Sequence, residues 1–133
     1  MSETTTIFLE LTNVTKENLQ TLAAKQVQIW NDTNEETRLV LMKEIYQDNV
    51  SFFDHESVVN GVVDLNGRIN SLQHNNVNFK FSLIKIDNNN NVVRYYWNYG
   101  PASNPELIAG MDLIILKNGK IRSLHVFLDR RPS

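Results

Sequence analysis

Residues 107–128, LIAGMDLIILKNGKIRSLHVFL, decide the fold of this chain. The first part, 107–116, is almost continuously apolar and runs into Lys117-Asn118-Gly119-Lys120. An Asn-Gly pair tolerates the positive φ angles of a type I′ turn and is the strongest short-range signal for a β-hairpin. We therefore predict two long antiparallel strands, over 107–116 and 121–128, joined by a tight turn.

Two further strands are predicted before this hairpin. Residues 79–83 alternate between apolar and polar side chains, and the parity slips at Ile84, which indicates a bulge. After four asparagines at 88–91, residues 93–99 are rich in the aromatic and branched side chains that favour strands. The second half of the chain is therefore predicted to be an antiparallel meander.

The first half of the chain has the period of helices instead. Thr15 is predicted to cap a helix whose apolar face is formed by Leu19, Leu22, Ala23, Val27 and Trp30. Thr33 or Asn34 is predicted to cap a second helix, which ends at Asp48-Asn49.

A short strand at 50–54, a loop at 55–60 and a third helix over 62–72 complete the first half. Helices kept apart from a run of antiparallel strands indicate an α+β domain. We expect this single domain over 15–133, after an N-terminal arm at 1–14. Its strongly curved sheet and three helices should enclose an apolar pocket.

Composition excludes several classes of protein. The chain has 133 residues, of which 41% are hydrophobic and 21% charged, as in one globular domain. The formal net charge of -2 gives no basic excess for nucleic acid, and the lack of cysteine excludes disulfides, Cys-based zinc sites and thiol nucleophiles. The sequence contains no apolar membrane span, and its polar first six residues have no basic leader. We expect a cytoplasmic protein that binds neither nucleic acid nor membranes and uses no metal or cofactor.

Four segments resemble the NTF2-like superfamily, and within it the SnoaL-like proteins and ketosteroid isomerases. They are residues 45–54, Gly61 with the helix after it, residues 110–113, and residues 118–129. The resemblance implies a cone-shaped fold of three helices packed on a curved antiparallel sheet. It does not fix the function, because this fold carries isomerases, cyclases and other enzymes as well as proteins without catalysis.

Asp54 is the first candidate catalytic residue. It follows Val50 and Phe52 on the same face of a strand, so its carboxylate should look into the pocket and have its pKa raised by desolvation. The resemblance implies a general base that moves a proton next to a carbonyl, although His55 stands where the isomerase pattern has proline. The alternative is an aspartate that accepts backbone hydrogen bonds at the end of the strand.

Asp112 and Trp30 are the other candidate catalytic residues. Asp112 lies within an apolar strand, so its carboxyl group must be neutral, paired or hydrogen-bonded. The resemblance implies a protonated acid that donates to a developing enolate, with the Trp30 N–H as a second donor where the isomerases have tyrosine. The alternatives are a core tryptophan and an aspartate paired with Arg38, Arg94 or His125.

Aromatic side chains are predicted to line the pocket and to bind a small apolar or polycyclic carbonyl compound. The candidate ligand-binding residues are Tyr46, Phe52, His55, Phe81, Tyr95, Trp97 and Tyr99. The alternative is that the aromatic residues form the core and that His55 lies in a solvated loop. His125 and Phe127 should point outward, where this fold commonly packs against a second subunit, so a homodimer is expected.

Three functions remain open at this point. The first is a small cofactor-free enzyme that uses acid/base chemistry next to a carbonyl, as an isomerase or a polyketide cyclase does. The second is a binding module without catalysis, in which Asp54 and Asp112 only anchor a small molecule. The third is a domain that binds another protein.

Overall fold

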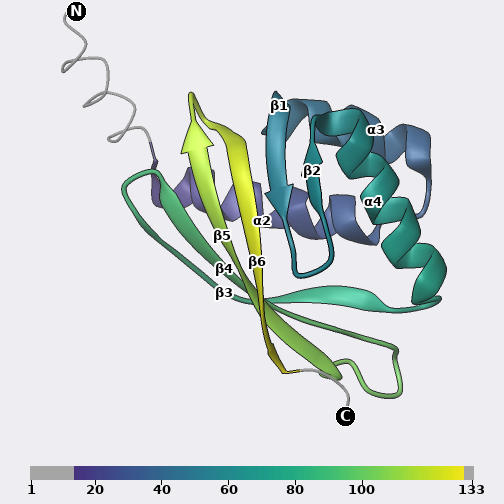
Figure 1. The fold of residues 1–133 in the computed structure, drawn as a ribbon. Coiled ribbons are helices and arrows are strands. Elements are labelled where there is room, and N and C mark those ends of the chain that lie inside the picture. The colour runs from purple at the N-terminus through teal and green to yellow at the C-terminus, as the bar shows by residue number, and fades with distance from the viewer. Residues whose placement is uncertain (1–13, 131–133) are drawn as a thin grey trace, which may run out of the picture.

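The computed structural model describes residues 14–130 (Figure 1). The arm predicted over 1–14 lies outside the described residues except for Val14. The elements, in chain order, are α2 (Lys16–Asn31), α3 (Glu35–Ile45), β1 (Tyr46–Phe53), β2 (Val58–Asn60), α4 (Val62–Asn75), β3 (Lys80–Asn89), β4 (Val92–Gly100), β5 (Ile108–Lys117) and β6 (Lys120–Arg130). The prediction of an α+β fold with three helices is confirmed.

Side-chain caps start the first two helices where the sequence predicts them. The Thr15 hydroxyl accepts a hydrogen bond from the backbone N–H of Asn18, at 3.1 Å, and α2 follows. Asn34, rather than Thr33, caps α3, because its Oδ1 accepts from the N–H groups of Glu36 and Thr37. Each cap satisfies backbone donors that the first turn of a helix leaves unpaired.

The hairpin that decides the fold has the predicted turn. Asn118 and Gly119 have φ angles of 52° and 78°, which are the positive values that a type I′ turn requires. The bulge predicted at Ile84 is also present, as a shift in the pairing of β3 with β4 between Leu83 and Lys85.

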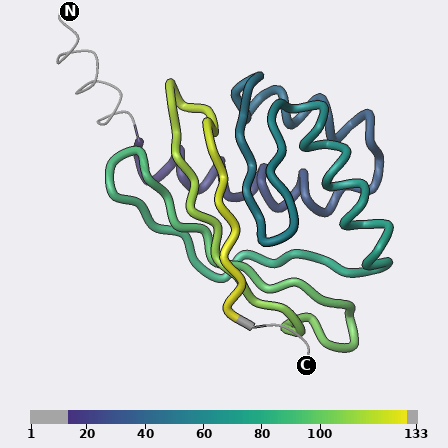
Figure 2. The backbone as a smooth tube through the Cα atoms, viewed as in Figure 1, coloured from purple at the N-terminus to yellow at the C-terminus, as the bar shows by residue number. Residues whose placement is uncertain are grey.

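The six strands form one mixed sheet in the order β2-β1-β6-β5-β4-β3. Four neighbouring pairs are antiparallel, but β1 runs parallel to β6, which lies between β1 and β5 (Figure 2). The prediction of a strongly curved antiparallel sheet is therefore corrected in two points: one of the pairings, β1 with β6, is parallel, and the sheet is not strongly curled. Alternation along a strand shows which face is buried but not which strand is its neighbour.

Two element boundaries also differ from the prediction. The second helix ends at Ile45 instead of at Asp48-Asn49, so residues 46–49 already belong to β1, and residues 58–60, predicted as a loop, pair with β1 as β2. The spacing of four between Tyr46 and Val50 fits a helical face and a strand face equally well. Only the pairing with β2 and β6 makes this segment a strand.

The helices pack on one face of the sheet, where the hydrophobic core lies. α2 packs against β3, while α3 and α4 pack against each other and against β1. The core includes the fully buried Ile29, Met42, Leu65, Ile69, Val93, Ile114 and Leu124. Within residues 14–130, no helix is long and apolar enough to cross a membrane.

A buried arginine joins α3 to α4. Arg38 is 0% exposed, and its guanidinium donates to Asn66, to Asn70 Oδ1 at 2.7 Å and to Gln73 Oε1 at 2.9 Å. Burial lowers the pKa of Arg38, while the nearby charges of Asp32 and Glu35 act in the opposite direction. Because three side-chain amides and the backbone carbonyls of Asp32 and Asn66 receive its hydrogen bonds, this cation is satisfied without a direct ion pair to any described residue.

Candidate functional site

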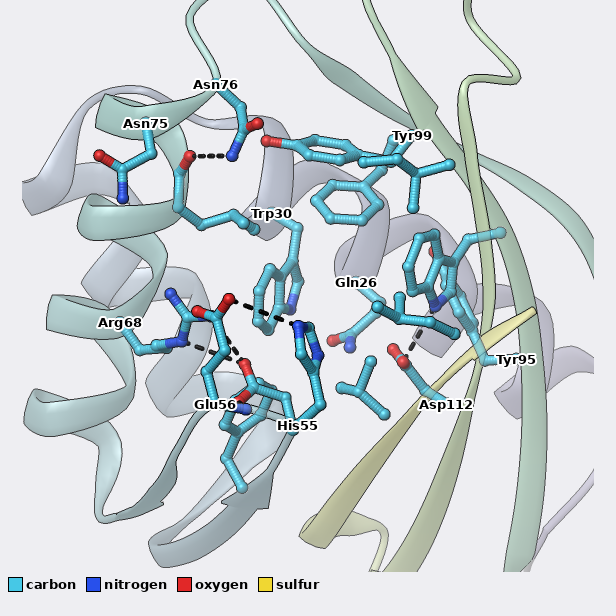
Figure 3. A pocket seen from close by; sticks show the side chains of 18 residues that line it. Gln26, Trp30, His55, Glu56, Arg68, Asn75, Asn76, Tyr95, Tyr99 and Asp112 are labelled. Carbon is cyan, nitrogen blue, oxygen red and sulfur yellow. Dashed lines mark hydrogen bonds and ion pairs between the residues drawn. The ribbon is translucent and has the colours of Figure 1, made fainter. Parts of the chain in front are cut away.

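A cavity of about 400 Å³ lies between the helices and the inner face of the sheet (Figure 3). Its wall includes six aromatic side chains, which are Trp30, Phe52, Phe81, Tyr95, Trp97 and Tyr99. The polar part of the wall comes from Gln26, Asp54, His55, Glu56, Arg68, Asn75, Asn76 and Asp112. Tyr46, which was also predicted to bind ligand, is 0% exposed and is not part of the wall.

The aromatic wall is built from rings that pack on each other. Phe81 stacks on Tyr99 with a centroid distance of 4.0 Å, and it meets Trp97 and Trp30 edge-on at 5.2 Å and 5.8 Å. Trp30 also contacts Phe52 at 5.7 Å. Such contacts hold each ring in place, so the cavity presents fixed, flat apolar surfaces.

Asp112 projects into this cavity from β5. It pairs with Tyr95 on β4 and Val126 on β6, and its Oδ1 accepts a hydrogen bond from Trp97 Nε1 at 2.9 Å. Burial raises the pKa of Asp112 to about 7, and the hydrogen bond from Trp97 opposes this rise only in part. The carboxyl group is therefore able to hold or release a proton near neutral pH.

The partner of Asp112 is thus Trp97 and not Arg38, Arg94 or His125, which the sequence left open. Arg38 binds α4, and Arg94 pairs with Asp87 at 2.8 Å on the surface. His125 stacks on Phe53 with a centroid distance of 4.4 Å.

Gly110 allows the indole of Trp97 to reach Asp112. Gly110 pairs with Trp97 across the β4–β5 ladder, and a Cβ at this position would lie 2.3 Å from Trp97 Cζ2. The missing side chain lets the ring lie over β5, two residues from the carboxyl group that it binds.

Asp54 has a different environment from the one predicted. Its Oδ1 accepts hydrogen bonds from the backbone N–H groups of Glu56 and Ser57, at 2.9 and 2.7 Å. Its Oδ2 accepts two from Arg68, at 3.1 Å from Nε and 2.8 Å from Nη2. Arg68 lies on the opposite side of the cavity from Asp112 in Figure 3.

The predicted rise in the pKa of Asp54 is wrong. Burial does act to raise this pKa, but the hydrogen bonds from Arg68, Glu56 and Ser57 and the charge of Arg68 outweigh it, so the pKa is lowered. Asp54 is the strand-end aspartate of the alternative interpretation, with an added ion pair. The neighbouring His55 has a side chain that is 43% exposed and lies 3.4 Å from Glu56.

Trp30 lines the cavity, but its N–H group is already used. Nε1 donates to the hydroxyl of Tyr46 at 3.0 Å, and that hydroxyl donates to Gln26 Oε1 at 2.6 Å. The prediction that the Trp30 N–H is available to an oxyanion therefore does not hold in this arrangement. Burial raises the pKa of Tyr46 well above its usual range, so its hydroxyl stays protonated.

Five polar residues of the cavity wall were not predicted from the sequence, and two of them, Gln26 and Arg68, have a recognisable signal in it. Gln26 lies three residues after Ala23 and four before Trp30, so it falls on the buried stripe of α2. Arg68 lies one turn after Leu65 on α4. A polar side chain on an apolar helical stripe is the signal that identifies both. Among the described residues, no group of three or more His, Asp or Glu side chains could hold a metal ion.

Solved structures resemble this chain, whereas no family model and no curated protein matches it. A provisionally assigned isomerase of the SnoaL-like family from Agrobacterium tumefaciens is 22% identical, with a TM-score of 0.79 over 85% of this chain and 98% of its own. A SnoaL-like structure from Jannaschia, provisionally assigned as a polyketide cyclase, is 11% identical, with a TM-score of 0.67 over 88% of both chains. A provisionally assigned ketosteroid isomerase from Kribbella flavida is 12% identical, with a TM-score of 0.68 over 88% of this chain and 82% of its own. These likenesses confirm the NTF2-like, SnoaL-like fold that the motifs indicated.

Proposed function

We propose that this protein, with its SnoaL-like fold, is a cofactor-free enzyme that transfers a proton at a carbon next to a carbonyl group. The ligand is a small apolar or polycyclic carbonyl compound held in the cavity. The observation that carries the proposal is Asp112, a buried carboxyl group with a pKa near 7 on an aromatic wall. General base catalysis is most efficient when the pKa of the base lies near the working pH.

The cavity suits such a ligand in size and character. Its volume of about 400 Å³ lies within the range of about 300–1,000 Å³ that small-molecule sites occupy. Stacked and edge-on rings offer flat surfaces to a flat ligand, and they keep water away from an enolate.

Asp112 takes the role of base that the sequence analysis gave to Asp54. In its ionised form it accepts the proton from the carbon next to the carbonyl, the electron pair of that C–H bond forms a C=C bond, and the π pair of the C=O bond moves onto the oxygen to give an enolate. Return of the proton to another carbon completes an isomerisation, while attack of the enolate on a second carbonyl closes a ring. Asp54 holds the 54–57 turn and Arg68 at the other side of the cavity.

Hydrogen–deuterium exchange tests this function. We would incubate 2-tetralone in D2O with the wild-type protein and with the Asp112→Asn variant, and follow the signals of its α-protons by NMR. The wild type should accelerate exchange, and Asp112→Asn should lose roughly 10²- to 10⁴-fold of that acceleration. Asp54→Asn is the matched control, and as long as it stays folded it should change the rate by only a few-fold. Saturable binding of the ketone without exchange by the wild type would overturn the proposal.

That negative outcome would favour a binding module without catalysis. This second function is supported by the observation that two of the three predicted catalytic groups already bind other residues of the protein. Asp54 pairs with Arg68, and Trp30 donates to Tyr46. In such a module, Asp112 and the aromatic wall would hold the ligand with no turnover.

We also propose that the protein forms a homodimer through the outer face of the sheet. Phe127 is 52% exposed there, and the stacked pair of Phe53 and His125 comes from the same face of β1 and β6. Exposed apolar rings of this kind commonly mark a contact with another chain. Sedimentation equilibrium should give twice the mass of one chain, and the mass of a single chain would contradict this proposal.

A further inference from the structure

Three buried side chains form a directed row of hydrogen bonds beside the cavity. Trp30 Nε1 is only a donor, so it must donate to the oxygen of Tyr46, 3.0 Å away. The hydroxyl hydrogen of Tyr46 then goes to Gln26 Oε1, at 2.6 Å. The reverse orientation of the Gln26 amide would leave the hydrogen of a fully buried hydroxyl without an acceptor. This chain of hydrogen bonds therefore requires that the oxygen of the Gln26 amide, Oε1, faces Tyr46.

The other end of the amide, Nε2, is left without a partner. Gln26 is 1% exposed, and its Nε2 is buried without an acceptor among the described residues. The same side chain forms part of the cavity wall. A buried donor without an acceptor is costly, and native proteins nearly always supply a partner. A ligand atom in the cavity would supply it here.

The side chains of Gln26 and Asp112 point toward the same part of the cavity. The charge of Asp112 affects the pKa of Tyr46, the residue to which Gln26 is bound, so the two groups lie within electrostatic range. Figure 3 shows both side chains reaching toward the same part of the cavity. Yet no hydrogen bond joins Gln26 to Asp112 in the part of the chain that the structure describes, and Oδ2 of Asp112 has no partner there either.

We infer that Gln26 Nε2 donates a hydrogen bond to the carbonyl oxygen of the ligand while Asp112 faces the neighbouring carbon. This inference rests on the proposed function and identifies Gln26 as the hydrogen-bond donor that acts beside Asp112 in the same site. When the Asp112 carboxylate accepts the α-proton, the C–H electron pair forms the new C=C bond and the C=O pair moves onto oxygen. The amide donor is then already aimed at the atom on which negative charge develops.

This arrangement selects the ligand as well as assisting the reaction. A hydrocarbon of the same shape would cover both polar groups and leave them unpaired, which disfavours its binding. A carboxylic acid would place a second negative charge near Asp112 once Asp112 is ionised. The site therefore takes neutral ketones in preference to matched hydrocarbons and acids.

A binding comparison tests the role of Gln26. We would measure by titration the affinities of 2-tetralone and of tetralin, which has the same bicyclic frame without the oxygen, for the wild type and for Gln26→Met. Methionine keeps the length of the side chain but removes both the Nε2 donor and the Oε1 acceptor of the Tyr46 hydroxyl. The wild type should favour the ketone, and Gln26→Met should lose about 3- to 10-fold of that preference, as one neutral hydrogen bond is worth. Gln28→Met, an exposed change on the same helix, is the matched control and should leave the preference unchanged.

A second measurement uses the wild type alone, so that a poorly folded variant does not decide the result. The side-chain amide signals of Gln26, assigned by triple-resonance NMR, should move downfield when 2-tetralone is added and much less when tetralin is added. Equal shifts with both probes, or an unchanged ketone preference in folded Gln26→Met, would overturn the inference. A ketone preference that depends on Gln26 without α-proton exchange would support Gln26 as a ligand-binding residue while the proposed reaction fails. Exchange that is as fast in folded Gln26→Met as in the wild type would overturn the inference and leave the reaction standing.

Discussion

Replacing Asp112 by asparagine should stabilise the protein at alkaline pH. Asparagine has nearly the same shape and can still accept the hydrogen bond from Trp97, but it carries no charge. Burial raises the pKa of Asp112 from 3.8 to about 7. Each tenfold change in proton affinity is worth about 1.4 kcal/mol, so the ionised carboxylate costs the folded state up to about 4 kcal/mol.

The direction of the pH effect follows from which state holds the proton. Below about pH 4, the carboxyl group is protonated in both the folded and the unfolded chain. Between about pH 4 and 7, only the folded chain holds the proton, so the wild type loses stability as pH rises through this range. Above about pH 7, both states are ionised and the loss is complete.

Urea unfolding followed by circular dichroism measures this effect. The free energy of unfolding of Asp112→Asn should be close to that of the wild type near about pH 4 and should exceed it by up to about 4 kcal/mol near about pH 8. Asp129→Asn, at an exposed position on β6, is the matched control and should show no comparable gain. A difference between Asp112→Asn and wild type that is the same at both pH values would refute the reasoning.

Two further pairs of variants test the packing around the site. Gly110→Ala should destabilise the protein by roughly 1–3 kcal/mol, because the added Cβ would collide with the Trp97 ring. Gly67 has open space around it on an exposed helical face, so Gly67→Ala should stabilise the protein by about 1 kcal/mol. Denaturant unfolding would measure both changes in stability, and the near-ultraviolet dichroism of the tryptophans would report a displaced Trp97 ring in Gly110→Ala. An unchanged Gly110→Ala protein would contradict the close packing. Arg38→Met should lower the free energy of unfolding by roughly 3 kcal/mol or more, because it leaves the buried amide oxygens of α4 without a hydrogen-bond donor. Arg94→Met, on the surface, should change the free energy of unfolding by less than about 1 kcal/mol. Similar losses in the two arginine variants by thermal unfolding would show that burial is not what makes Arg38 important.

Much of the fold could be predicted because its signals are local. The Thr15 and Asn34 caps, the Asn118-Gly119 turn and the bulge near Ile84 each depend on a few adjacent residues, and the structure contains all of them. The parallel pairing of β1 with β6 joins segments about seventy residues apart, and no pattern within either segment specifies the partner.

The candidate site shows the same division between local and distant information. Strand alternation places Tyr95, Trp97 and Tyr99 on one face of the sheet, because a strand alone decides which face its residues share, and these three side chains line the cavity together with Asp112. The pKa of Asp54 could not be predicted, since it depends on Arg68 from a different helix. The engagement of the Trp30 N–H likewise depends on Tyr46, sixteen residues away and on a strand.

The pH dependence of the exchange reaction tests the central claim most directly. The rate of α-proton exchange in 2-tetralone would be measured with the wild type from about pH 4 to 9, after subtraction of the rate with Asp112→Asn. If Asp112 is the base, the remaining rate rises to a plateau with an inflection near pH 7, where burial has set the pKa of this carboxyl group. A rate that is already at its plateau at about pH 5, or one that Asp112→Asn matches throughout, would contradict the claim.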